Sequence, residues 1–271
     1  MVEIIEKTKK TSLVDLIWMT NKKTSSKRYI ELDLLRGLAI LLMIFGHILW
    51  DLDYFGLVKI NSTLYSILQY IVPPLFFILV GMSIIAGRKN HTFTKEQEKK
   101  YYEKMIIRGL KIFNLGMFLT IASLFAMPET PVYFGVLHCI GISIILSTIF
   151  LKYKHYNFIF AVLILSLSVL FSQIHLQNPS ILHMVFGIHQ ADIWKYTVDY
   201  FPLVPWFGLT LLGMGIGNIL YVKEKRSFKV PSFSYLRPVK LFSWFGRHSL
   251  EIYLIHQPVI AGFLYLFIKV L

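Results

Sequence analysis

The chain has 271 residues, of which 55% are hydrophobic and only 16% are charged, with a mean hydropathy of +0.59. A soluble domain carries about 25% charged residues, so this composition excludes an ordinary soluble protein. The formal net charge is +13, but the basic residues gather in short segments between apolar blocks, which argues against nucleic-acid binding. The single cysteine, Cys139, excludes an intrachain disulfide and a cysteine-rich metal site.

The apolar blocks have the length of about twenty residues that a helix needs to cross a bilayer. They predict an all-α integral membrane protein, a bundle of about seven transmembrane helices. The expected spans are 32–50, 64–87, 105–127, 132–151, 157–174, 202–222 and 249–270. The segment from Met1 to Arg28 is polar and rich in lysine, so we expect no secretory signal there.

The basic residues fall into alternate connections between these spans. The N-terminal arm and the second, fourth and sixth connections are basic, whereas the other three contribute only Lys59 and Lys195. The positive-inside rule therefore predicts a multi-pass protein of the cell membrane with a cytoplasmic N-terminus and an external C-terminus. We divide the chain into a basic cytoplasmic arm, 1–30, and a single transmembrane domain, 31–271.

The first span carries Arg36 near its beginning and His47 near its end. At about 100° and 1.5 Å per residue, the two side chains lie about 20° apart around the helix and roughly 16 Å apart along it. Asp51 follows His47 at the i+4 spacing at which a carboxylate can contact and orient an imidazole that acts as a general base. We therefore expect His47 and Asp51 to be catalytic.

Simpler interpretations apply at the same edge, which reads "GHILWDLDYFG". Asp51 and Asp53 are also consistent with the first solvated residues beyond the helix, and His47 with a hydrogen bond to a backbone carbonyl. We favour the boundary interpretation for Asp53 and the functional one for His47 with Asp51. Arg36 either belongs to the functional face or forms a structural ion pair with Asp33, three residues before it.

Later elements carry further signals. Pro73-Pro74 is expected to interrupt the second span. The second connection is expected to continue as helix into the third span, with a mostly solvated basic face. In the sixth span, "GMGIG" (213–217) offers a small-residue face for close helix approach. The sixth connection is basic and interleaved with aromatic residues, which is typical of a segment at headgroup level that binds phosphate groups.

Two histidines lie inside or at the head of later spans. His256 lies near mid-membrane in "SLEIYLIHQPVI", where a histidine usually faces the bundle interior; an interhelical hydrogen bond and a role in catalysis both stay open. His138 heads the fourth span and is a candidate for the same cavity as His47. The histidines of the fifth connection lack the close spacing of metal ligands, so we expect no metal.

Four segments together resemble one family. They are "ELDLLRGLAILLMIFGHILWDLDYFG" (31–56), "FGVLHCIGISIIL" (134–146), "DYFPLVPWFGLTLLGMGIGN" (199–218) and "FGRHSLEIYLIHQPV" (245–259). In order and spacing they resemble the DUF1624 family, membrane proteins related to the catalytic domain of heparan-alpha-glucosaminide N-acetyltransferase, within the wider transmembrane acyltransferase superfamily. The resemblance covers nearly everything from residue 30 onward.

The resemblance implies acyl transfer from cytosolic acyl-CoA, usually acetyl-CoA, to an amine or hydroxyl of a sugar or similar acceptor across the membrane. His47 would act as the general base or as the acyl carrier. Acetyl-CoA is then a cosubstrate. The expected donor-binding residues are Arg36, Arg247, His256 and Trp206, and the expected acceptor-binding residues are Asp53, His138 and Asp199.

One departure from the family leaves alternatives open. The lysosomal members align asparagine with His47 and carry their important histidine in the next loop, whereas 51–63 contains no histidine here. A small-solute transporter or channel also fits a bundle with a broken second span, and so does a non-catalytic lipid-binding subunit whose basic loops contact anionic lipid. The expected partners are the bilayer, acyl-CoA and a small or lipid-tethered acceptor, and a homodimer is compatible with the sequence.

Overall fold

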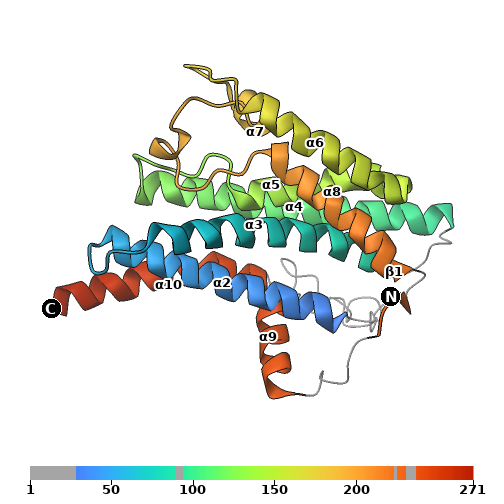
Figure 1. The fold of residues 1–271 in the computed structure, drawn as a ribbon, viewed down its shortest axis with the longest axis horizontal. Coiled ribbons are helices and arrows are strands. Elements are labelled where there is room, and N and C mark those ends of the chain that lie inside the picture. The colour runs from blue at the N-terminus through green and yellow to red at the C-terminus, as the bar shows by residue number, and fades with distance from the viewer. Residues whose placement is uncertain (1–28, 89–93, 223–224, 230–235, 271) are drawn as a thin grey trace, which may run out of the picture.

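The computed structural model describes residues 29–88, 94–222, 225–229 and 236–270. The expected basic arm, 1–30, lies outside the described residues except for its last two. Long helices run side by side along the molecule (Figure 1). They are α2 (Ile30–Tyr54), α3 (Ser62–Ala86), α4 (Lys95–Ala126), α5 (Val136–Phe150), α6 (Asn157–Phe171), α8 (Leu203–Leu220) and α10 (Ser249–Val270).

Shorter elements connect these helices. They are α7 (Ile181–Phe186), α9 (Arg237–Arg247), the 3-10 turns η2 (Leu151–Tyr156) and η3 (Ile193–Lys195), and the strands β1 (Tyr221–Val222) and β2 (Lys225–Arg226). The two strands form one short antiparallel pair. The predicted all-α architecture is confirmed, since each expected span overlaps one long helix and α4 begins within the second connection, as expected.

Six described segments are long and apolar enough to cross a membrane. One of them, Val136–Phe171, contains both α5 and α6. Lys154, within η2, has a φ of 46° and separates the two helices, so this segment is not one straight helix. The expected count of seven spans and the expected orientation therefore stay predictions.

α3 continues without a break through Pro73 and Pro74, so the expected interruption is wrong. Proline has a φ that suits a helix, but it lacks the N–H bond and its ring crowds the carbonyl of residue i−4. Packing against neighbouring helices can offset these costs. The transporter alternative thereby loses the broken helix that had suggested it.

The glycines of α8 let its neighbours approach closely. Gly213 lies against the backbone of Ile78 in α3, and Gly215 lies against the ring of Phe158 in α6. A Cβ at Gly213 would collide with the carbonyl oxygen of Ile78, so only glycine permits this approach. The small-residue face expected for "GMGIG" is confirmed.

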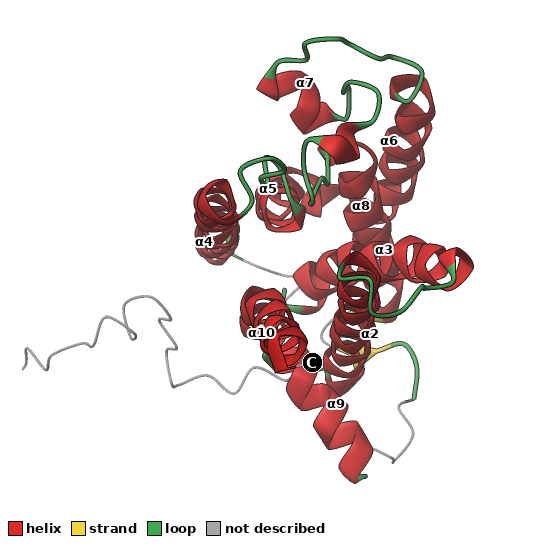
Figure 2. Cartoon of the chain, turned by 90° about the vertical axis from the view of Figure 1, so that its left-hand side faces the viewer, coloured by secondary structure: helices red, strands yellow, loops and turns green. Residues whose placement is uncertain are grey.

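α9 lies across the other helices, beside α2. Viewed from the left-hand side of Figure 1, α4 and α5 are seen nearly end-on while α9 extends across the view (Figure 2). Gly37 of α2 and Gly246 of α9 bring the two backbones together, because a Cβ at Gly37 would collide with the carbonyl oxygen of Phe242 and one at Gly246 with that of Asp33. The sequence did not predict this helix.

Candidate functional site

Two histidines meet where α10 packs against α2. The ring centroids of His47 (α2) and His256 (α10) lie 4.8 Å apart, with the ring planes at 58°. His256 is 9% exposed. Its Nδ1 lies 2.6 Å from the carbonyl oxygen of Tyr253, and because a carbonyl only accepts, Nδ1 carries the proton. Nε2 of His256 then carries a lone pair, and this atom is buried without a hydrogen-bond partner among the described residues.

Asp51 lies one turn beyond His47 but does not bond it. Asp51 is 2% exposed, and its two carboxylate oxygens accept hydrogen bonds from Nε2 of Gln257 in α10, at 3.0 and 3.2 Å. The expected contact between His47 and Asp51 is therefore wrong for the described structure. A buried carboxylate needs a donor, and the amide of the facing helix supplies it, while the ring of His47 lies against that of His256.

Tyr253 extends this cluster toward the loop before α8. Its ring centroid lies 5.5 Å from that of His256, and its hydroxyl donates to Asp199. Asp199 also accepts a hydrogen bond of 3.1 Å from the backbone N–H of Val136, the first residue of α5. Burial raises the pKa of the Asp199 carboxyl to about 6, and the hydrogen bonds from Val136 and Tyr253 oppose that rise.

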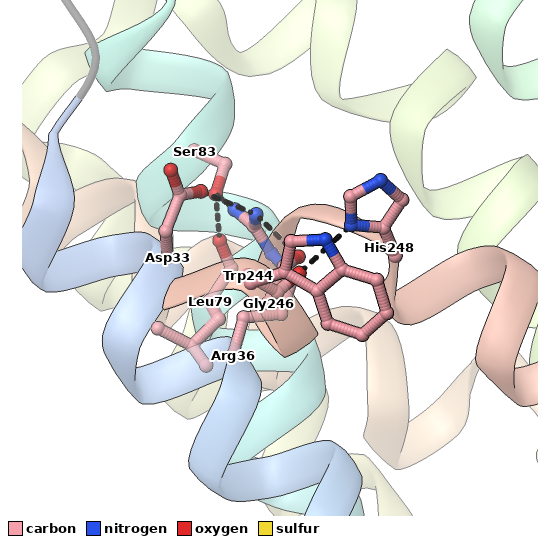
Figure 3. A network of polar contacts seen from close by, with 7 residues as sticks. All are labelled: Asp33, Arg36, Leu79, Ser83, Trp244, Gly246 and His248. Atoms are coloured by element: carbon pink, nitrogen blue, oxygen red, sulfur yellow. Dashed lines mark hydrogen bonds and ion pairs between the residues drawn. The ribbon is translucent and has the colours of Figure 1, made fainter. Parts of the chain in front are cut away.

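Arg36 lies near the opposite end of α2, where α2, α3 and α9 meet (Figure 3). Its guanidinium donates to Oδ1 of Asp33 at 3.0 Å, to Oγ of Ser83 at 2.8 Å and to the carbonyl oxygen of Gly246 at 3.3 Å. The ion pair with Asp33 is thus confirmed. The same cation satisfies a carbonyl in the last turn of α9, where a positive charge is favourable.

Arg108 of α4 brings a second cation to this end of the bundle. It lies close enough to Arg36 for the two charges to repel. Its side chain is exposed, and no hydrogen bond or ion pair joins it to another residue of the described part. Two neighbouring guanidinium groups favour binding of an anion. Arg108 was not predicted as a site residue, because the second connection was expected to form a mostly solvated basic face.

The other expected donor-binding residues do not join either cluster. Arg247 is exposed in the last turn of α9. Trp206 packs in an aromatic cluster of the core, with ring centroids 5.1 Å from Phe77 and 4.7 Å from Phe201. Its size and ring contacts account for its position there.

Two of the expected acceptor-binding residues are occupied by local bonds. His138 is 1% exposed; its Nδ1 accepts from the N–H of Gly135 at 3.1 Å, and its Nε2 lies 3.3 Å from Oγ1 of Thr120. One ring nitrogen thus caps the start of α5, and the other contacts α4. Asp53 is exposed and accepts from the N–H of Ile60 at 3.1 Å, as a residue at a helix boundary does.

Sequence reasoning gave no role to Tyr253 and Gln257. Their spacing with His256, at i, i+3 and i+4 from Tyr253, places all three on one face of α10. Three polar residues at this spacing in a mostly apolar helix predict a buried polar contact.

The family described as heparan-alpha-glucosaminide N-acetyltransferase, catalytic, matches residues 28–258. No curated protein and no solved structure matches the chain. The family match includes both clusters, from Arg36 at one end of α2 to the histidine pair at the other, and it ends just after Gln257. The chain therefore belongs to the family of the heparan-alpha-glucosaminide N-acetyltransferase catalytic domain.

Proposed function

We propose that the protein is a membrane acetyltransferase that takes an acetyl group from acetyl-CoA and transfers it to an amine or hydroxyl of a sugar or similar acceptor. Membership of the family supports the reaction class. The observation that carries the proposal for this chain is the contact of 4.8 Å between the rings of His47 and His256. A histidine beside a second, neutral histidine is suited to receive a proton from a nucleophile.

The donor is proposed to bind with its phosphates at the basic end. Arg108 presents a guanidinium group that has no hydrogen bond or ion pair in the described part, and such a group can bind phosphate oxygens with two parallel hydrogen bonds. Arg36, which is held by Asp33, Ser83 and Gly246, adds positive charge beside it. His47 follows Arg36 along the same helix by roughly 16 Å at 1.5 Å per residue. The narrow pantetheine arm of CoA would run along this length of α2 and deliver the thioester to His47.

In the proposed reaction, His47 takes the proton of the acceptor N–H or O–H while that nitrogen or oxygen attacks the thioester carbonyl. The C–S bond breaks, and the CoA thiolate leaves and takes up a proton. In the alternative, the imidazole of His47 attacks the thioester carbonyl first, and the C–S bond breaks as the CoA thiolate leaves. The acceptor nitrogen or oxygen then attacks the acetyl-imidazole, the C–N bond to His47 breaks, and the acceptor's proton passes to the imidazole. We favour the one-step version, because the lone pair of His256 lies beside His47. It can accept a hydrogen bond from one ring nitrogen of His47 while the other nitrogen takes the proton.

We propose the seven-helix topology for this reaction, with α5 and α6 as separate spans joined at η2. Lys152 and Lys154 lie in that connection, which the positive-inside rule places at the cytoplasmic face of the cell membrane together with Arg36 and Arg108. His47 and Asp199 then lie toward the outer face, where a small or lipid-tethered acceptor would enter.

The test uses the full chain purified into lipid nanodiscs, with radiolabelled acetyl-CoA as donor and glucosamine as acceptor. We expect transfer by the wild type and a loss of at least about 100-fold in His47→Ala. His155→Ala is the matched control, because His155 is an exposed histidine of η2. Size-exclusion elution and thermal unfolding confirm that each variant is folded.

Two results would overturn the proposal. Transfer by His47→Ala at the wild-type rate would remove the catalytic role of His47. If the wild type neither transfers acetyl groups nor is stabilised by CoA, the acetyl-CoA-dependent function is wrong, since a ligand at 100 times its Kd should add about 2.7 kcal/mol to the unfolding free energy.

A further inference from the structure

Nε2 of His256 is a buried acceptor without a donor. The carbonyl oxygen of Tyr253 holds the proton on Nδ1, so the tautomer of His256 is fixed with its lone pair on Nε2. That atom has no partner among the described residues. Buried acceptors in folded proteins are almost always hydrogen-bonded, so this lone pair marks a place where an N–H or O–H belongs.

The ring of His47 is the donor within reach. The amide of Gln257 is already bonded to Asp51, and the hydroxyl of Tyr253 is bonded to Asp199. Neither nitrogen of His47 is hydrogen-bonded to another residue of the described part. Two imidazole rings joined by an N–H···N bond of about 2.9 Å have centroids roughly 5 Å apart, and the observed separation is 4.8 Å.

We propose that His256 is a positioning residue for His47. After a turn of the His47 ring about its Cβ–Cγ bond, Nε2 of His256 accepts the N–H of one His47 nitrogen and leaves the other nitrogen as a lone pair directed at the acceptor. This inference rests on the acetyl transfer proposed above. When His47 takes the acceptor proton and becomes an imidazolium, the bond to His256 stabilises its charge, as the carboxylate does in a Ser-His-Asp triad.

The bond between Asp51 and Gln257 supports this arrangement from one residue away. Gln257 follows His256 directly, so its hydrogen bonds to α2 fix both the rotation and the height of α10 at His256. Asp51 therefore influences His47 by holding the helix that carries His256. This explains how a carboxylate one turn beyond His47 can matter without touching it.

The kinetic test compares His256→Ala, His256→Gln and the control His155→Ala, with radiolabelled acetyl-CoA and glucosamine. We expect His256→Ala to lower kcat by about 10- to 100-fold, which is the typical cost of losing the hydrogen-bond partner that orients a metal-ligating histidine. The KM for acetyl-CoA should stay within about twofold, because the interaction acts in the chemical step. His256→Gln keeps an acceptor oxygen and should recover part of the lost kcat.

The second readout does not depend on activity. Nitrogen NMR of the histidine rings, assigned with the His47→Ala and His256→Ala variants, reports which nitrogen of His47 carries the proton. We expect one tautomer of His47 in the wild type and a mixture of both in His256→Ala. A structural role of His256 in packing alone would leave the His47 tautomer unchanged.

The outcomes separate this inference from the proposed function. If the wild type transfers acetyl groups while His256→Ala keeps both kcat and the His47 tautomer, the positioning role is wrong and the function stands. If no transfer occurs but His256→Ala changes the tautomer of His47, the contact is real and the proposed reaction is wrong. Loss in His256→Gln as complete as in His47→Ala, with the His47 tautomer unchanged, would make His256 the base and overturn its positioning role.

Discussion

Gln257 of α10 donates its amide to both carboxylate oxygens of Asp51 on α2, at 3.0 and 3.2 Å. The carboxylate is 2% exposed, and this neutral amide is its hydrogen-bond donor in the described structure. The pair joins residues from the first and last long helices of the described chain beside the histidine contact. Its loss should therefore affect the packing of α10 as well as catalysis.

Replacing Gln257 with leucine should destabilise the fold. The variant leaves a buried carboxylate without a donor, which costs about 1–3 kcal/mol of unfolding free energy. Thermal unfolding of the purified protein in detergent measures the change. The double variant Asp51→Leu with Gln257→Leu is the matched control and should recover most of the loss, because it removes both polar groups. Equal stability of Gln257→Leu and wild type would show that Asp51 has another donor.

Asp199 should make stability depend on pH. Its pKa in the fold is raised from 3.8 to about 6, so the folded state holds this proton more tightly than the unfolded state does. Stability contributed by the protonated carboxyl is complete below pH 3.8 and is lost as pH rises to about 6. We expect a loss of about 1 kcal/mol over this interval, less than the full shift implies, because the residue keeps some contact with solvent.

The measurement is the difference in melting temperature between wild type and Asp199→Asn across that interval. The asparagine variant lacks the titrating group, so its melting temperature should fall less between pH 4 and 6, the range that the two pKa values bracket. Parallel curves for the two proteins would contradict the raised pKa of Asp199.

Alanine at Gly246 should separate α9 from α2. The added Cβ would collide with the carbonyl oxygen of Asp33, and such overpacking costs about 1–3 kcal/mol or more. Gly262→Ala is the control, since nothing lies within 4 Å of a Cβ added there. That control should be neutral or stabilising by up to about 1 kcal/mol, because alanine favours helix over glycine. Similar melting temperatures for the two variants would argue against the close crossing.

Replacing Arg108 with glutamine should weaken donor binding without unfolding the protein. Arg108 has no ion pair within the described part, so its charge is available to a phosphate. We expect the KM for acetyl-CoA to rise about tenfold, which corresponds to about 1.4 kcal/mol. Lys111→Gln is the matched control, because Lys111 is an exposed cation less than one turn along α4. An equal effect of both variants would indicate only a general attraction between charges.

The helices were predictable from the sequence because each depends on a local apolar block. α2, α8 and α10 lie close to the expected ranges for that reason. α9 was not predicted, because its eleven residues are amphipathic and too short for a spanning block. The break expected at Pro73 was wrong for a different reason. The packing of α3 against α8 outweighs the local tendency of proline to interrupt a helix.

The site was predictable only in part. His47 was selected from its depth and its face of the first helix, both local properties. The residue that contacts His47 was not predicted. The i+4 rule considers only residues on the same helix, and it therefore pointed to Asp51. His256 and Gln257 reach that place only after α10 packs against α2, which helical spacing does not reveal.

The chain passes from α9 to α10 through His248 alone. His248 is anchored at this corner, with its Nδ1 2.9 Å from the carbonyl oxygen of Trp244 and its ring 4.5 Å from the indole centroid. Such a short link sets the distance between the crossing of α9 with α2 and the start of α10, and therefore the height at which His256 and Gln257 reach α2. A change in the length of this link should therefore disturb both contacts at once.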